Sequence, residues 1–360
     1  MILKKRRNPA VALMIVITSI VILSFGIREL VLKTGAQVDR VRNSYDRTQA
    51  LYLARSTQNI ARILVILHTT VSPDRDSARS TWNQPIVFPI PIEALSALSE
   101  SFGAEEPRRF DLDFEERTIV DRCQDFFAGF QGEAISQVED LSARLNLNDL
   151  NRPELQETLR RLMTRDFQLI ESLRDRNIDP EQVVREALQY ISAEVDFFLP
   201  RPIDYEYEPK RRELSVTEEF KMLPSVDDEL FQSIKDDIVA VSFPRRPRPS
   251  KINMNTVSRE LFQSLLQGVP NPEVIADRFV RERDEEGREF GENDLPQILE
   301  FLQLEERMLP IELLDTKSQF YRISTLARVG ETKIELESIL KSPSLSDQEI
   351  QPFVRMRVSP

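Results

Sequence analysis

The sequence is poor in the residue types that most often carry enzymatic chemistry. Its 360 residues include one cysteine, Cys123, and one histidine, His68. A single cysteine cannot form a disulfide within the chain, and neither residue has a partner at the spacing of a catalytic pair or a metal site. We therefore expect a packed or surface histidine, an inert buried thiol and no enzymatic activity.

Glycine is also scarce, and proline is missing from one long stretch. Nine glycines in 360 residues leave few places for a phosphate-binding loop, and no nucleophile-elbow or zinc-protease motif occurs. No proline lies between Pro9 and Pro73, and apolar residues recur at helical spacing over residues 27–67. These features predict one helix of about 50 to 60 residues.

Positive charge is in deficit. The chain has 48 basic and 60 acidic residues, and its net charge is −12. Affinity for nucleic acid rests on neutralising phosphates, so this balance argues against a general nucleic-acid-binding protein. One basic stretch outside the N-terminus, "FPRRPRPSK" at 243–251, is rich in proline and predicts an extended linker.

The N-terminus has the pattern of a membrane anchor. Residues 10–27 form a run of 18 without charge, which at about 1.5 Å per residue can cross most of a hydrocarbon core of about 30 Å. The sequence "KKRR" at 4–7 precedes the run and predicts a cytoplasmic N-terminus by the positive-inside rule. The exit from the run shows no A-x-A-like site, which argues against an ordinary secretory signal.

The remaining chain places helices between two groups of strands. Strands are predicted at 86–90, near 134–141, and in a late hairpin whose strands join at Val329-Gly330-Glu331. Residues 101–133 give no single pattern. The order of elements predicts a helical subdomain of about six short helices inserted into an α+β head.

Helix boundaries between residues 150 and 315 come from local signals. Two capping boxes and two proline-marked starts are predicted, and two glycines mark helix ends. The capping boxes are Asn151 with Glu154 and Ser215 with Glu218; the starts are Asp179-Pro180 and Asn271-Pro272; the ends are Gly268 and Gly287.

Two further patterns resemble binding sites. Residues 251–295 have the outline of a helix-hairpin-helix unit, which often contacts DNA backbones, but acidic residues at its helix junctions favour a protein-contact module. The carboxylate clusters do not follow the D-x-D-x-D-G calcium pattern. Calcium is therefore expected only as a structural ion.

Taken together, these segments resemble the general secretion pathway protein K family, the minor pseudopilins of type II secretion systems. The similarity covers most of the chain: the "AVALMIV" start, "QALYLARSTQNIA", "ELSVTEEFKMLPSVDDELFQSI" and the closing "FYRISTLARVG". The most specific segments are "RLNLNDL" and "INMNT". They contain the family-motif residues Asn146, Asn148, Asn253, Asn255 and Thr256.

The resemblance implies an α+β fold in which a pilin-like long N-terminal helix packs on an antiparallel sheet, with a large inserted all-helical subdomain. It implies the following division of the chain. A prepilin-type leader covers 1–10, the long helix 11–72 with its transmembrane part at about 11–28, the first part of the head 73–150, the inserted subdomain with helix-hairpin-helix-like units 151–315, the C-terminal strands 316–342 and a tail 343–360.

The resemblance also implies a processing site and an assembly position. A prepilin peptidase would cut after Ala10, beside Pro9, and leave Val11 as the new N-terminus; the family usually has glycine where Ala10 stands. Most pilins carry glutamate at the fifth mature position, which is Ile15 here. A buried glutamate is costly in a membrane unless it pairs with the terminal amine of the subunit ahead, so Ile15 suits a subunit at the filament tip.

The function implied is that of a non-enzymatic tip pseudopilin. It would sit in the bacterial inner membrane with a cytoplasmic N-terminus and a periplasmic bulk, start a filament with other minor pseudopilins, and contact secreted substrate and the outer-membrane channel. Family members bind calcium in the insertion, and the carried-over candidates are Asp175 and Asp179. The alternatives are a minor pilin of a type IV pilus and a membrane-anchored DNA-binding protein.

Overall fold

The structure is a computed structural model of the chain. It describes residues 9–71, 76–77, 79–88, 132–192, 209–242, 249–291, 294–342 and 350–359. Most of the 101–133 segment, Cys123 and the larger part of the basic stretch at 243–251 therefore lie outside the described residues.

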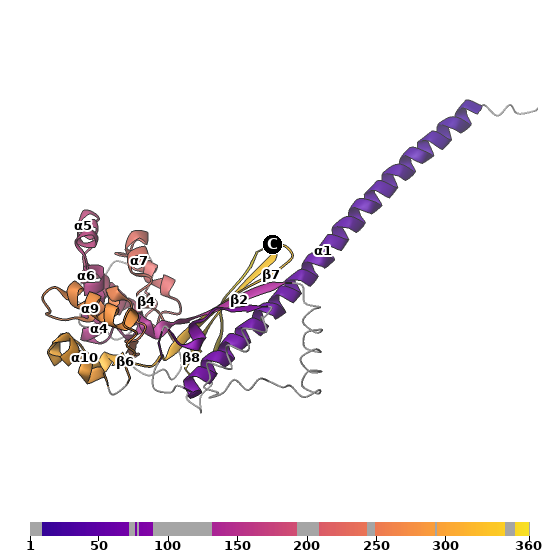
Figure 1. Cartoon of the computed structure of the whole chain (residues 1–360). Coiled ribbons are helices and arrows are strands. Elements are labelled where there is room, and N and C mark those ends of the chain that lie inside the picture. Colours follow the sequence, from indigo (N-terminus) through magenta and orange to yellow (C-terminus); the bar gives the residue numbers. More distant parts are fainter. Residues whose placement is uncertain are drawn as a thin grey trace, which may run out of the picture.

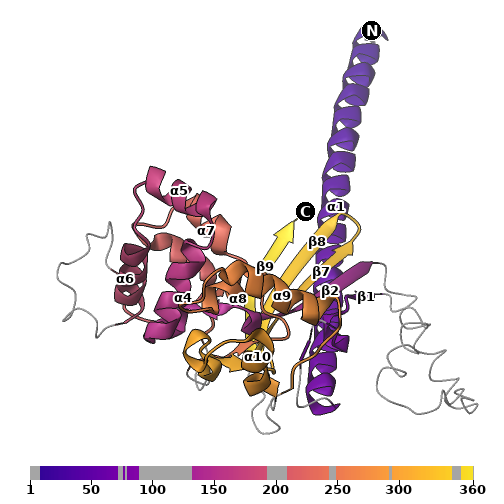
Figure 2. The ribbon, with the colours of Figure 1, turned by 60° about the vertical axis from the view of Figure 1, so that its left-hand side comes forward.

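One continuous helix, α1 (Pro9–Val71), dominates the N-terminal part. Figures 1 and 2 show its first half extending away from the rest of the molecule and its second half lying against a sheet. Ala50, Leu53, Ala61 and Val65 are buried on the sheet side of that second half. The predicted long helix is confirmed, because the stretch has no proline to remove a backbone hydrogen bond and a continuous apolar stripe to bury.

The sheet has five antiparallel strands in the order β1-β2-β7-β8-β9. Side chains of β2 alternate between exposed and buried along the whole strand, so one face of the sheet covers α1 and the other faces outward. The tight β7–β8 turn at Gly330 (φ +58°) confirms the predicted late hairpin. The bounds are β1 (Ile86–Phe88), β2 (Glu133–Asp140), β7 (Phe320–Val329), β8 (Thr332–Lys341) and β9 (Ile350–Ser359).

A mainly helical insertion separates β2 from β7 in sequence and lies beside the sheet in space (Figure 2). It has its own apolar core, centred on fully buried side chains such as Leu159, Phe262 and Phe279. The insertion also contains two short parallel strand pairs, β3 with β4 and β5 with β6. Its elements are β3 (Leu145–Asn146), α4 (Pro153–Met163), α5 (Phe167–Asp175), α6 (Pro180–Ile191), α7 (Asp228–Ile234), β4 (Ile238–Val239), β5 (Ile252–Asn253), α8 (Arg259–Leu265), α9 (Pro272–Asp284), α10 (Leu295–Leu302) and β6 (Leu314–Asp315), with 3-10 turns between them.

Local capping signals were right at some helices and wrong at others. Asp179 caps α6, since its carboxylate accepts a hydrogen bond from the Glu181 N–H and Pro180 takes the first helical position. Asn151 does not cap α4. That helix starts after Arg152, whose side chain makes no capping bond, because Pro153 occupies the first helical position.

The second predicted capping box is also wrong. Ser215 precedes only a 3-10 helix (Thr217–Met222), whose cap position is Val216. The Ser215 hydroxyl instead accepts a hydrogen bond from Lys210 Nζ at 3.0 Å. This local contact, from a residue five positions earlier, engages the hydroxyl that the cap would need.

Residues 343–360 are not only a tail, because β9 occupies 350–359 and pairs with the outer side of β8. Pro352 concealed this strand in the sequence, since proline lacks an N–H and is confined to edge strands and bulges. Here β9 is an edge strand. Its pairing with β8 is irregular between Glu337 and Ile339, opposite the proline.

Gly132, just before β2, lies in close contact with β7 and α1. Its φ is +153°, and a Cβ there would lie 2.8 Å from the Arg328 carbonyl oxygen and 3.1 Å from Leu53 Cδ2 of α1. We expect Gly132→Ala to lower the free energy of unfolding by about 2 kcal/mol, from backbone strain and overpacking. Thermal denaturation of the full chain in detergent micelles measures the effect.

Gly35→Ala is the matched control, because a Cβ at Gly35 on α1 meets nothing within 4 Å. That substitution should be neutral or stabilising by up to about 1 kcal/mol, since alanine favours helix over glycine. Equal melting temperatures for the two variants would show that the contact at Gly132 is not tight.

Candidate functional site

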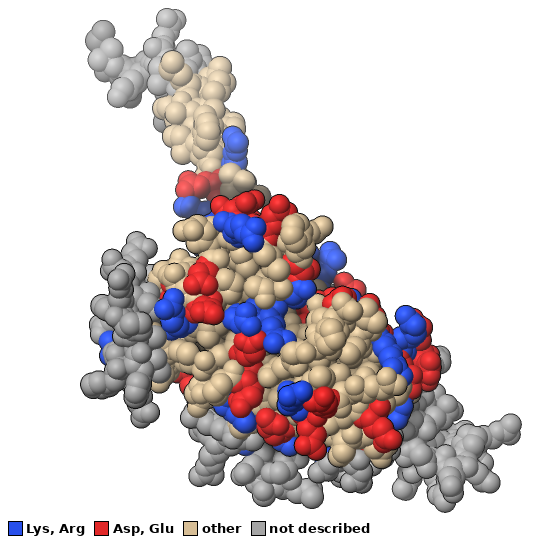
Figure 3. All heavy atoms as spheres, turned by 90° about the vertical axis from the view of Figure 1, so that its left-hand side faces the viewer, with Lys and Arg blue, Asp and Glu red and all other residues tan. Residues whose placement is uncertain are grey.

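The first functional region is the exposed half of α1. Pro9, Ala10 and Val11 lie in its first turn, and Ile15 is 62% exposed. In the described part of the chain, one helical stretch, Leu13–Thr69, is long and apolar enough to cross a membrane, and its most apolar window is 0% buried. Figure 3 shows this end of the helix as a surface almost without charged side chains.

The second region is the junction between the head and the insertion, where the two asparagine motifs form matching turns. Asn146 ends β3, and its Oδ1 accepts a hydrogen bond from the Asn148 N–H at 3.2 Å. Asn253 ends β5, and its Oδ1 accepts one from the Asn255 N–H at 3.0 Å. Both are asparagine turns, in which the side chain mimics a backbone turn.

The second asparagine of each motif binds the backbone of a distant segment on both its atoms. Asn148 accepts from the Leu214 N–H at 2.7 Å and donates to the Leu214 carbonyl at 3.0 Å. Asn255 accepts from the Phe290 N–H at 2.8 Å and donates to the Phe290 carbonyl at 2.9 Å. The insertion therefore contains two similarly built units, each held at its start by one N-x-N motif.

Asp140, the last residue of β2, is the centre of the junction. Its Oδ2 accepts hydrogen bonds from Asn253 Nδ2 at 3.0 Å and Ser318 Oγ at 2.6 Å, and also from Thr256 Oγ1. Its Oδ1 accepts from the Ser142 N–H at 2.8 Å. Burial raises the pKa of this carboxyl to about 6, although the hydrogen bonds that it accepts lower the pKa.

A second buried carboxylate, Asp76, joins the end of α1 to the sheet. Asp76 accepts hydrogen bonds from Trp82 Nε1 at 3.2 Å and the Tyr321 hydroxyl at 2.9 Å. His68 Nε2 lies 3.0 Å from Asp76 Oδ1. His68 is thus a packed residue, and its carboxylate neighbour, which no ligand spacing in the sequence indicated, is brought to it by folding.

Burial and the nearby carboxylates Asp76 and Asp140 raise the pKa of Tyr321. Tyr321 therefore stays protonated and donates. The two carboxylates, the asparagines and the hydroxyls form one buried polar network that connects α1, β2, β7 and the insertion. Such a network fixes the relative position of its elements when its members are bonded.

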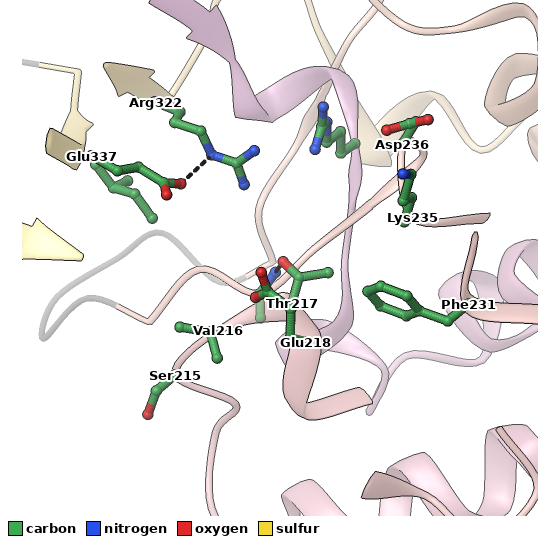
Figure 4. A pocket seen from close by; sticks show the side chains of 12 residues that line it. Ser215, Val216, Thr217, Glu218, Phe231, Lys235, Asp236, Arg322 and Glu337 are labelled. Carbon is green, nitrogen blue, oxygen red and sulfur yellow. Dashed lines mark hydrogen bonds and ion pairs between the residues drawn. The ribbon is translucent and has the colours of Figure 1, made fainter. Parts of the chain in front are cut away.

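Two hollows lie on the surface at the junction. One, of about 260 Å³, is lined by Thr217 and Phe231 of the insertion and by Arg322 and Glu337 of the sheet (Figure 4). Arg322 Nε and Glu337 Oε1 are 3.0 Å apart. The other hollow, of about 290 Å³, is lined by Trp82, Asp140 and Thr256 among others, and Arg144 and Asp236 line both.

The predicted calcium candidates lie in the α5–α6 region. Asp175 ends α5, and Asp179 Oδ2 lies 4.0 Å from Arg185 Nη2 while its Oδ1 caps α6. Among the described residues, no group of three histidine, cysteine, aspartate or glutamate side chains is arranged to hold a metal ion. Calcium binding by Asp175 and Asp179 stays a prediction.

Sequence reasoning singled out the asparagines of the junction but not their partners. The repeated apolar-Asn-apolar-Asn pattern was the visible signal. Asp76, Asp140, Ser318 and Tyr321 were missed, because they come from segments up to 245 residues apart and carry no shared local pattern.

Comparison with solved structures finds matching chains, one of which belongs to a type 2 secretion system. No family model and no curated protein matches the chain. The chain superposes on a chain of the crystal structure of the GspK-GspI-GspJ complex from the enterotoxigenic Escherichia coli type 2 secretion system, with a TM-score of 0.56 and 16% sequence identity. The match covers 89% of this chain and 99% of that one. This chain therefore has the fold of a component of that complex: a long N-terminal helix, an antiparallel sheet and further helices.

Proposed function

We propose that this protein is a non-enzymatic minor pseudopilin of a type II secretion system. The observation that carries the proposal is the fold shared with a component of the GspK-GspI-GspJ complex over 89% of the chain. The exposed apolar start of α1 supports it, since a span of this kind can anchor the protein in a bilayer. The basic residues before it support an N-terminus in the cytoplasm and a periplasmic bulk across the bacterial inner membrane.

The subunit stands at the tip of the filament and starts its assembly. Two features support this placement. Ile15 leaves the fifth mature position without the acid that would need the terminal amine of a subunit ahead, so nothing is left unpaired in the membrane when no such subunit exists. The insertion extends to one side of the sheet, which suits a position that does not repeat along a thin fibre (Figure 1).

The buried junction gives the tip its rigidity. Asp140 ends β2 and Ser318 lies just before β7, so both residues stand where the chain passes between the sheet and the insertion, and the polar network includes both. A force applied along α1 would pass through Asp76 and Asp140 into the insertion, which is the part placed to contact secreted substrate and the outer-membrane channel. The hydrogen bonds of the junction thus fix the positions of its segments, because its donors bind backbone carbonyls or carboxylates.

Processing is tested on the mature protein. Expressed in a host that has a prepilin peptidase, the chain should show an N-terminus at Val11 by mass spectrometry of the intact protein, because cleavage after Ala10 removes the basic leader. Ala10→Gly should be processed at least as completely, as glycine is the residue usual in the family. A mature protein that keeps Met1 would argue against the pilin-like pathway.

Partnership is tested by co-expression with the small pseudopilins encoded in the same genome. The full chain, extracted in mild detergent, should co-purify with them in fixed stoichiometry. Recovery as a monomer with every such candidate would remove the tip-complex proposal. Stable complexes with subunits of a type IV pilus instead would favour the minor-pilin alternative.

A further inference from the structure

The segment that follows α1 connects two parts of the molecule. We call four of its residues, Asp76, Ser77, Arg79 and Ser80, the strap. Hydrogen bonds within the strap close a tight turn. The Ser77 N–H donates to Ser80 Oγ at 3.0 Å, and the Ser80 N–H donates to the Ser77 carbonyl oxygen at 3.0 Å. The Arg79 N–H donates to Ser77 Oγ at 3.2 Å. The turn therefore fixes the position of Arg79 relative to Asp76.

One end of the strap is buried in the junction. Asp76 is 4% exposed, and its carboxylate lies 3.0 Å from His68 Nε2 of α1 and accepts a hydrogen bond from Tyr321 of β7. The Asp76 N–H donates to the Thr316 carbonyl oxygen at 2.9 Å, and the Asp76 carbonyl accepts from Asn253. Salt screens buried contacts much less than exposed ones, so this end stays attached at high ionic strength.

The other end of the strap lies against the C-terminal end of α9. Arg79 is exposed, and its Nη2 donates to the carbonyl oxygen of Asp284, the last residue of that helix, at 3.1 Å. The Ser77 hydroxyl donates to Glu289 Oε1 at 2.6 Å. These two bonds join residues 205 and 212 positions apart in the chain. The strap therefore ties the end of α1 to the insertion.

Gly287 leaves the space in which the Arg79 guanidinium lies. Gly287 has a φ of +73°, and a Cβ there would lie 3.0 Å from both Cζ and Nη2 of Arg79. Gly268 has a similar backbone conformation, with a φ of +65°, but a Cβ there would meet nothing within 4 Å. Alanine at either position pays for the left-handed backbone, and alanine at Gly287 also displaces Arg79.

The end of α9 has an excess of negative charge. Residues 281–286 contain two arginines and four acids, a balance of 2 − 4 = −2, at the end of a helix where the backbone dipole is itself negative. The acids at 282 and 284 pair with neighbouring arginines at 3.1 and 2.7 Å. Glu285 and Glu286 form no ion pair within the described chain. A cation from another segment offsets this charge, and Arg79 supplies it.

We propose that the strap is a salt-sensitive device that sets the angle between the insertion and α1. The two units of the insertion share one apolar core, so they move as one body. The network around Asp140 attaches this body to the sheet, and the bond from Arg79 to α9 is a second attachment on another element. Two attachments fix the angle, and one leaves the insertion free to turn.

The two ends of the strap differ in how easily they release. Asp76 is buried with all its bonds, whereas the contact of Arg79 with the acidic end of α9 is exposed and is weakened by salt. The closed state therefore gives way at Arg79 while Asp76 remains attached. This inference goes beyond the proposed function and does not depend on it, since the strap and its contacts lie within one chain.

Distances between spin labels on the full chain in micelles, measured by double electron–electron resonance, report the angle. Labels at Asn59→Cys on α1 and Glu273→Cys on α9 follow the insertion. Labels at Asn59→Cys and Glu335→Cys on β8 follow the sheet and form the control pair. All three positions are exposed. Cys123→Ser is included throughout, so that the introduced cysteines alone carry the label.

At low salt the insertion pair should give one narrow distance distribution in the otherwise unchanged chain. Arg79→Ala should raise the ratio of open to closed molecules about fivefold, which corresponds to about 1 kcal/mol. Gly287→Ala should widen the distribution in the same way, and Gly268→Ala should not. Arg79→Lys keeps the charge and should restore most of the narrow distribution. High salt should widen the distribution of the unchanged chain and leave that of Arg79→Ala as it was.

Three results would overturn the proposal. The first is a distribution for Arg79→Ala as narrow as that of the unchanged chain. The second is equal widening by Gly287→Ala and Gly268→Ala, which would assign the effect to backbone strain. The third is widening of the control pair in Arg79→Ala, which would mean that the substitution loosens the whole head. A distribution of the unchanged chain that is insensitive to salt would overturn the ionic release at Arg79.

Discussion

Replacing Asn253 with alanine is expected to lower the free energy of unfolding by about 3 kcal/mol. Asn253 is 0% exposed, and its Nδ2 donates to the Asp76 carbonyl oxygen at 3.0 Å and to Asp140 Oδ2 at 3.0 Å. Alanine would leave the carbonyl without this donor and remove one of the donors to a buried carboxylate. Unmade hydrogen bonds of this kind cost more than the bonds themselves contribute, above all next to a charge.

Chemical denaturation of the full chain in micelles, followed by the fluorescence of Trp82, measures this loss, since Trp82 is buried beside the junction. The matched control is Asn59→Ala on α1, where the side chain is exposed and the change should stay within about 0.5 kcal/mol. A similar small change for Asn253→Ala would mean that the network does not hold the insertion to the head.

Acidification is expected to stabilise the junction. Asp140 has a pKa of about 6 in the folded protein against a model value of 3.8. The folded state therefore binds more protons than the unfolded state between these two values. Stability contributed by this group is lowest above pH 6 and rises as the pH falls through 6 toward 4. Between pH 7.5 and pH 5 the gain is about 1.4 kcal/mol, at about 1.36 kcal/mol for each pKa unit.

The test compares melting temperatures at pH 7.5 and pH 5 for the wild type and for Asp140→Asn, which cannot titrate. The variant should lose the gain attributed to Asp140. Burial also raises the pKa of Asp237, which contributes with the same sign and remains in the variant. A variant that gains as much on acidification as the wild type would show that Asp140 does not carry the effect.

The expected effects of Asn253→Ala and of acidification both concern the buried network around Asp140. The insertion is attached to the head through a network whose central acid, Asp140, is destabilised by burial when it is ionised and stabilised in that form by the donors around it. At neutral pH the four donors around Asp140 offset its desolvation. Substitutions that remove a donor should therefore be more harmful at pH 7.5 than at pH 5.

Local signals predicted those elements whose cause is local. The helix α1 follows from a proline-free apolar repeat, the β7–β8 hairpin from alternation around Gly330, and the start of α6 from Asp179-Pro180. The capping box at Asn151 failed because Pro153 sets the start of α4 one residue later, and the one at Ser215 failed because Lys210 engages the serine hydroxyl. The strand β9 was missed because its stability comes from pairing with β8.

The sequence by itself determined the apolar N-terminal span, the long helix and the order of strands around a helical insertion. It also singled out the asparagines of the two N-x-N motifs. Only the tertiary structure decided what those asparagines bind and that Asp76 reaches His68 and Tyr321. The physical reason is the distance along the sequence over which each effect acts. Helix periodicity and turn chemistry act within a few residues, whereas burial, and with it the pKa of Asp140 and the donors it needs, depends on segments brought together only by folding.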